Sequence, residues 1–261
     1  MVNAIFPLGH FMELDFTFFA VAIPAVLFAG ISKGGFGSAA AFAAAPLLAM
    51  ILEPAQAVAV MLPLLVVMDF SALPPYWRKW DNRISWVLIL GGIPGAFLGA
   101  VLISMVDADV FRFLIGLIAL AFVMFQISRD FRWMRPSETE MSDRLGFVFA
   151  IGAGFTSFIA HAGGPVASVY MLSKKLTKLE YQATTIIAFW FNNLLKIGLY
   201  LWLGFLSWQT ALADLYLIPF AILGTYLGVR LHRIVPEKLY FTLIYIFLTI
   251  AGTKLIFDAL S

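Results

Sequence analysis

The chain has 261 residues, of which 62% are hydrophobic and 12% are charged, and its mean hydropathy is +0.95. A soluble domain of this length would need far more polar surface, so the composition excludes the soluble globular class. The net charge of +2 gives no indication of a nucleic-acid partner, and the absence of cysteine excludes a disulfide framework and a thiolate metal site.

Long unbroken apolar runs, such as the uncharged stretch 84–106, predict an all-α integral membrane protein rather than a β-barrel with short alternating segments. No Lys or Arg precedes the first apolar run, so we do not expect a cleaved signal peptide. Two of the predicted segments, 38–53 and 165–175, are short for a full crossing. The segments lie near residues 14–32, 38–53, 55–77, 84–106, 109–127, 144–160, 165–175, 180–205, 208–231 and 237–257.

The connection between the first two segments, "GISKGGFGS" at 30–38, combines a lysine with a Gly-Gly turn. Glycine allows a tight turn and lets a ligand approach the backbone N–H groups, and a lysine adds positive charge. These features favour an anion site, although Lys33 as an ordinary cytoplasmic flank is an equally open interpretation. The candidate substrate-binding residues of this turn are Ser32, Lys33, Gly34, Gly35 and Ser38.

Asp69 lies well inside the third segment. An ionisable side chain within a membrane span is costly and is by default a functional hypothesis. Asp69 is therefore a candidate for proton coupling, with a purely structural ion pair to a lysine as the alternative.

An internal repeat organises the chain. "IPGAFLGAVL" at 93–102 matches "IPFAILGTYL" at 218–227, and the pair Gln56-Ala57 matches Gln182-Ala183. Each half holds five segments, and an odd number makes the second half enter from the opposite side, as in many secondary transporters. We predict an N-terminal repeat at 1–127, a cytoplasmic linker at 128–143 and an inverted C-terminal repeat at 144–261. The Gly-rich segments are then short or re-entrant helical hairpins that meet near the midplane.

The second Gly-rich turn, in "GAGFTSFIAHAGGP", supplies the matching candidates Ser157, His161, Gly163 and Gly164. His161 suits substrate contact or proton coupling, because histidine titrates near neutral pH. The alternative is a histidine that merely bonds carbonyls at a helix end.

Three polar side chains follow in the eighth segment, "IIAFWFNNLLKIGLY": Asn192, Asn193 and Lys196. Amides in hydrocarbon are costly unless they face protein or water, so the asparagines are candidate substrate contacts and Lys196 a candidate for proton coupling. Helix–helix hydrogen bonding is the structural alternative for the asparagines.

Basic residues predict the orientation. Four clusters hold thirteen of the 17 Lys and Arg, and all four fall on the cytoplasmic side if both termini are outside. The sequence thus predicts a multi-pass protein of the cell (inner) membrane with its N-terminus and C-terminus outside. The clusters are Arg78, Lys79 and Arg83; Arg129, Arg132, Arg135 and Arg144; Lys174, Lys175 and Lys178; and Arg230, Arg233 and Lys238.

The motifs "GISKGGFGSAAAFAAAPLL" at 30–48 and "GFTSFIAHAGGPVASVYML" at 154–172 resemble those of the sulfite exporter TauE/SafE family, also called the toluene sulfonate uptake permeases. The second motif departs from the commonest family pattern, which is richer in glycine. The resemblance implies a permease for sulfite, organosulfonates or related anions.

We therefore expect a secondary transporter for a small anion, with a passive anion channel as the alternative. No catalytic set, metal site or cofactor is expected, because nucleophile, zinc and phosphate-loop motifs are absent. The expected partners are the anionic substrate, protons and the lipid bilayer; a monomer and a homodimer are both compatible with the sequence.

Overall fold

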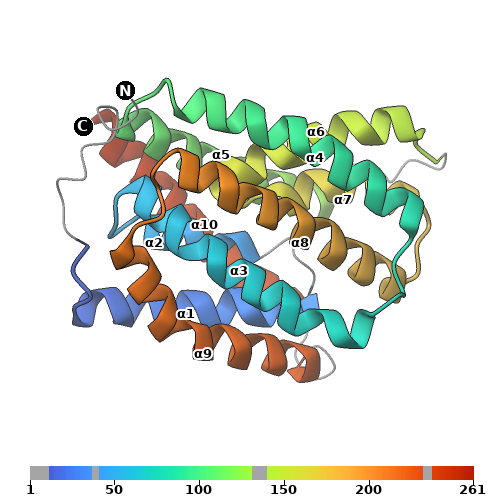
Figure 1. Ribbon diagram of the computed structural model, residues 1–261, viewed down its shortest axis with the longest axis horizontal. Coiled ribbons are helices and arrows are strands. Elements are labelled where there is room, and N and C mark those ends of the chain that lie inside the picture. Colours follow the sequence, from blue (N-terminus) through green and yellow to red (C-terminus); the bar gives the residue numbers. More distant parts are fainter. Residues whose placement is uncertain (1–11, 37–40, 131–139, 232–236) are drawn as a thin grey trace.

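The computed structural model describes residues 12–36, 41–130, 140–231 and 237–261, and every regular element within these ranges is helical (Figure 1). The elements are α1 (Phe16–Ile31), the π-helical turn η2 (Ser32–Phe36), the 3₁₀ turn η3 (Ala41–Ala43), α2 (Ala44–Leu48), α3 (Pro54–Tyr76), α4 (Asn82–Ile103), α5 (Ala108–Asp130), α6 (Asp143–Ala160), α7 (Gly163–Ser173), α8 (Lys178–Trp202), α9 (Trp208–Leu231) and α10 (Glu237–Leu260).

Seven of these helices are long and apolar enough to cross a membrane: α1, α3, α4, α5, α6, α9 and α10. The prediction of an all-α membrane protein is confirmed, and the chain is a multi-pass membrane protein. Helix α8 has 25 residues, but Asn192, Asn193 and Lys196 near its centre lower its hydropathy, and all three side chains are buried. Its polar face therefore points into the bundle, away from lipid, while Phe191, Leu194 and Leu201 on its other face are exposed.

The two Gly-rich segments form hairpins whose second legs are short. Helix α7 has 11 residues and α2 has 5, against the roughly 20 that a crossing needs. Each hairpin returns to the end of the molecule where it began. Asp143 at the start of α6 contacts Lys174 just after α7, and Asp15 before α1 lines the same cavity as Leu52 after α2.

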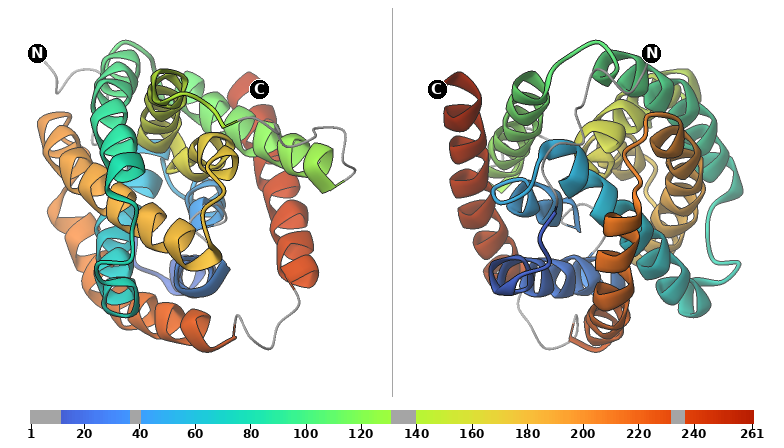
Figure 2. Two further views of the ribbon diagram at one scale, coloured as in Figure 1. Left: turned by 90° about the vertical axis from the view of Figure 1, so that its right-hand side faces the viewer. Right: turned by 60° about the vertical axis from the view of Figure 1, so that its left-hand side comes forward.

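The helices of the two halves pack against each other in matching pairs. Helix α1 packs on α9, and α4 packs on α6. By order in the two halves α1 corresponds to α6 and α9 to α4, so these two contacts are equivalent. Helices α3 and α8 pack together at the centre, and α5 packs on α10; both views of Figure 2 show α1 beside α9 and α10 beside α5. Two-fold related halves would pack in this way, while the inverted repeat itself stays a prediction.

Glycines allow the closest of these crossings. A Cβ on Gly154 of α6 would stand 2.2 Å from the carbonyl oxygen of Gly92 on α4. A Cβ on Gly34 in η2 would stand 2.1 Å from the carbonyl oxygen of Thr225 on α9. Small residues at helix crossings let backbones approach closely, which is how membrane helices gain packing energy without a hydrophobic driving force.

The two ends of the bundle differ in charge and shape. At the end where Glu53 precedes α3 and where α10 carries Asp258, a cavity of about 590 Å³ is lined by these two residues and by Glu13, Asp15 and Arg112; we call this the acidic end. The opposite end, where α4, α6 and α8 begin, carries Arg83 and Lys174 and is called the basic end.

Asp214 lies within the second turn of α9. Its side chain is buried, and its Oδ1 has no hydrogen-bond partner in the described part of the chain.

Candidate functional site

The first Gly-rich turn positions Lys33 in the interior. Helix α1 gives way to the π-helical turn η2, and such turns occur frequently at functional sites. The Lys33 side chain is 3% exposed and forms an ion pair with Asp69, which is fully buried on α3. Gln182 Nε2 donates to the Lys33 carbonyl oxygen at 3.0 Å and so attaches this turn to α8. The interpretation of Lys33 as an exposed cytoplasmic flank is wrong, because the side chain is buried beside a carboxylate.

Asp69 joins the two halves. One carboxylate oxygen bonds Lys33, and the other accepts a hydrogen bond of 2.8 Å from Asn193 Nδ2 on α8. A buried carboxylate is tolerated when both of its oxygens are paired in this way.

The second Gly-rich turn positions His161. This residue ends α6 in the left-handed conformation, with φ 55°, which histidine adopts more readily than most residues. His161 Nε2 lies 2.9 Å from the carbonyl oxygen of Val58, and Nδ1 lies 2.9 Å from Lys196 Nζ. Because a carbonyl can only accept, Nε2 carries the proton and Nδ1 accepts from the lysine.

Lys196 is a buried lysine whose hydrogen-bond partners are neutral groups. Its Nζ donates at 3.0 Å to both the carbonyl oxygen and the Oγ of Ser157, besides the bond to His161. The end of α6 offers it a partial negative charge. Among the described residues, no carboxylate lies within ion-pair distance of Lys196.

Both turns reach one small cavity between the halves. It holds about 10 Å³, close to the least volume that a single water requires. The first turn of α7, which includes Gly164, also faces this space, and free N–H groups at a helix start favour an anion. The cavity is lined by Lys33, Ala41, Leu65, Ser157, His161, Gly164, Phe189 and Asn193.

The structure separates the two asparagines. Asn193 faces Asp69 and the central cavity, whereas Asn192 faces α4 and donates at 3.4 Å to the Leu88 carbonyl oxygen. The Oδ1 of Asn192 is buried without a hydrogen-bond partner among the described residues. Asn192 is one of the residues that line a second cavity of about 10 Å³, which shares Ser157 and Phe189 with the first.

The remaining candidates have the following places. Ser32 is buried directly after α1, and Gly34 and Gly35 belong to η2, where Gly34 also packs on α9. A Cβ on Gly163 would stand 2.5 Å from the Ala153 carbonyl oxygen, which gives this glycine a packing reason. Ser38 lies outside the described residues.

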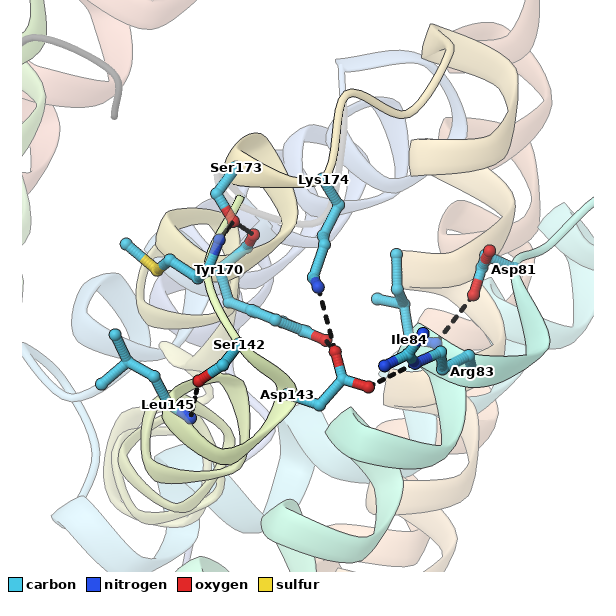
Figure 3. Close-up of polar contacts among 10 residues, drawn as sticks. Asp81, Arg83, Ile84, Ser142, Asp143, Leu145, Tyr170, Ser173 and Lys174 are labelled. Atoms are coloured by element: carbon cyan, nitrogen blue, oxygen red, sulfur yellow. Dashed lines mark hydrogen bonds and ion pairs between the residues drawn. The ribbon is translucent and has the colours of Figure 1, made fainter. Parts of the chain in front are cut away.

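Sequence reasoning missed two groups. Gln182 matches Gln56 in the internal repeat, but it is not among the predicted site residues. That match is the signal that points to it in the sequence. The other group surrounds Asp143 at the basic end, where Arg83, Tyr170 and Lys174 converge on one carboxylate (Figure 3). Its basic members were interpreted as topology signals alone.

Comparison with models of protein families identifies one family that matches this chain. The model of the family described as "Sulfite exporter TauE/SafE" matches residues 22–255, which include both Gly-rich turns, α3 and α8. A search of curated proteins gives no match. A search of solved structures gives none either. The match extends over nearly the whole chain, and the chain therefore belongs to the sulfite exporter TauE/SafE family of membrane permeases.

Proposed function

We propose that this protein is a secondary transporter for a small anion, a sulfur-containing oxyanion such as sulfite or an organosulfonate, which binds between the two halves. The observation that carries the proposal is a second buried lysine next to the central cavity. Lys33 pairs with Asp69, while Lys196, which bonds the lining residues Ser157 and His161, has neutral partners. An unpaired buried charge is costly, and a bound anion offsets that cost.

The small volume of the cavity indicates an occluded state. A cavity of about 10 Å³ cannot hold a sulfonate, so binding requires the helices around it to separate. The hairpin turns and the facing helices α3 and α8 come from both halves, so movement of one half against the other would open the site.

The bond between His161 and Lys196 gives a route for proton coupling. With Nε2 protonated toward Val58, a second proton on the ring must go to Nδ1, which now accepts from Lys196. Proton uptake would therefore break this bond and free Lys196 Nζ for an anion. We propose that proton uptake and anion binding are linked at this pair.

Anion binding to purified protein tests the site. We expect sulfite and small sulfonates to bind, in a screen that includes thiosulfate and short carboxylates. Lys196→Gln should weaken that binding roughly ten- to a hundredfold, because one hydrogen bond to a charged group contributes roughly 1.5–3 kcal/mol. Lys254→Gln is the matched control, since Lys254 pairs with Asp258 on α10 at the surface. Equal affinities in the two variants would contradict the proposed site.

Flux in proteoliposomes separates the transporter from the channel. We expect a pH gradient to drive uphill accumulation of the anion, and His161→Gln to abolish the gradient dependence. Downhill flux that ignores the pH gradient would support the passive channel instead.

A further inference from the structure

We infer that Asp143 and the three side chains bound to it form a gate, which closes a permeation path running along α6 from the basic end to the central cavity. This inference rests on the proposed function, since it assigns the exit that a transported anion would use at one end.

The gate is a network around one carboxylate. Asp143 Oδ2 forms an ion pair with Arg83 on α4, and Oδ1 accepts from Lys174 Nζ and from Tyr170 OH, both at 2.9 Å (Figure 3). One carboxylate therefore connects the start of α4, in the first half, with the start of α6 and the end of α7, in the second half. Any movement of α4 away from α7 must break at least one of these contacts.

Tyr170 couples this network to the interior. Its ring is fully buried and lies against Gly146, where a Cβ would stand 2.3 Å from the ring carbon Cε2. Its hydroxyl is attached to Asp143, so the ring stays in place while the carboxylate is paired. The ring packs in one cluster with Ala150, Ala153 and Ala167, which line the second cavity together with Asn192.

Small residues of α6 mark the path between these points. Gly146, Ala150, Ala153 and Gly154 recur at helical spacing on the buried face of α6, between Asp143 and Ser157. The last three of them line the Asn192 cavity together with Ser157 and Phe189, and Ser157 and Phe189 also line the central cavity. The path thus has an inner constriction at Phe189 and an outer one at Tyr170.

The buried amide of Asn192 supplies the observation that points to a ligand. A buried acceptor without a donor costs free energy, so in another state its partner is water or a protonated group of the substrate. Hydration of this cavity from the basic end would supply that partner. In the present state the network closes the basic end. At the acidic end, by contrast, the cavity of about 590 Å³ lies between the start of α1 and the residues that follow α2.

Cysteine accessibility tests the gate without any need to know the anion. The natural chain has no cysteine, so Ala153→Cys alone introduces a single reporter on the buried face of α6. We expect slow reaction with an impermeant methanethiosulfonate reagent applied at the basic end. Adding Asp143→Asn should raise the rate of this reaction roughly five- to tenfold, and only for reagent applied at the basic end. The increase reflects a larger population of the open state, because two partly exposed ion pairs are lost.

Arg83→Gln provides a second arm in case Asp143→Asn impairs folding, because the Arg83 side chain is 79% exposed. Lys254→Gln, which removes an ion pair at the opposite, acidic end, should leave the rate of labelling from the basic end unchanged. Unchanged labelling in both Asp143→Asn and Arg83→Gln, or equal acceleration from the two ends, would overturn the gate. Faster labelling without binding of any tested anion would leave the gate standing and reject the proposed function instead.

Discussion

At the scale of single residues, the two halves use the same arrangement with different chemistry. In the first half, a turn residue contacts a polar side chain 36 positions later, Lys33 with Asp69. In the second half, the corresponding pair, His161 with Lys196, is separated by 35 positions. The lysine lies on the turn in one half and on the long helix in the other. As a result the lysine of the first half has a carboxylate partner, while the lysine of the second half has neutral partners.

The buried pair of Lys33 and Asp69 gives the first prediction. Lys33→Met leaves the Asp69 carboxylate without its cation, and breaking a buried pair costs roughly 3–5 kcal/mol. The double variant Lys33→Met/Asp69→Leu removes both charges and should recover most of that stability. The thermal midpoints of the purified single and double variants measure this. A double variant no more stable than Lys33→Met would contradict the assignment of a coupled pair.

At the scale of elements, close helix crossings hold the hairpins in position. Helix α6 lies against α4 through Gly154 and Gly92, and η2 lies against α9 through Gly34. These contacts set the depth at which His161 and Lys33 reach the interior. Packing at the crossings therefore determines the geometry of the central cavity, although the glycines carry no side chain.

Substitution at one crossing gives the second prediction. Gly154→Ala places a Cβ 2.2 Å from the Gly92 carbonyl oxygen, so α4 and α6 must separate. We expect a loss of roughly 1–3 kcal/mol, the usual cost of overpacking. Gly198→Ala on α8 is the control, since no atom lies within 4 Å of its added Cβ, and better helix propensity should make it neutral or stabilising. Equal thermal midpoints for the two alanine variants would show that the α4–α6 crossing tolerates a side chain.

At the scale of the whole molecule, the asymmetric ends describe one state of a transport cycle. The acidic end has a large cavity, the Asp143 network joins α4 to α6 and α7 at the basic end, and a cavity of about 10 Å³ lies between the halves. No residue lines both the acidic-end cavity and the central cavity in the described part of the chain. Alternating access would require the network to open as the acidic end closes.

Orientation in the membrane gives the third prediction. Ile51 and Lys175 follow the short second legs of the two hairpins, and both side chains are exposed. An inverted repeat places them on opposite sides, with Lys175 in the cytoplasm according to the distribution of basic residues. Ile51→Cys and Lys175→Cys, labelled with impermeant reagent in whole cells and in inverted vesicles, should therefore give opposite patterns. Labelling of both cysteines from the same side would reject the inverted repeat.

The sequence alone determined the class of the protein, because length and hydropathy are local properties. Apolar runs sufficient to cross a bilayer predict helices whatever their neighbours, and seven described helices meet that criterion. Family motifs were also readable in the sequence, since Gly-rich turns need particular residues at particular positions. The intramembrane polar residues could be identified as candidates because each one alone is costly in lipid.

Tertiary structure decided which of those residues meet. Asn192 and Asn193 are neighbours in sequence, but successive positions on a helix point about 100° apart, so one faces α4 and the other Asp69. The pairing of Lys33 with Asp69 and of His161 with Lys196 depends on how α3 and α8 pack against the two turns. The network at Asp143 likewise depends on the approach of α4 to α6 and α7, because its other members lie 27 to 60 positions from Asp143 in the chain. Such contacts arise from packing between distant segments, which no local pattern specifies.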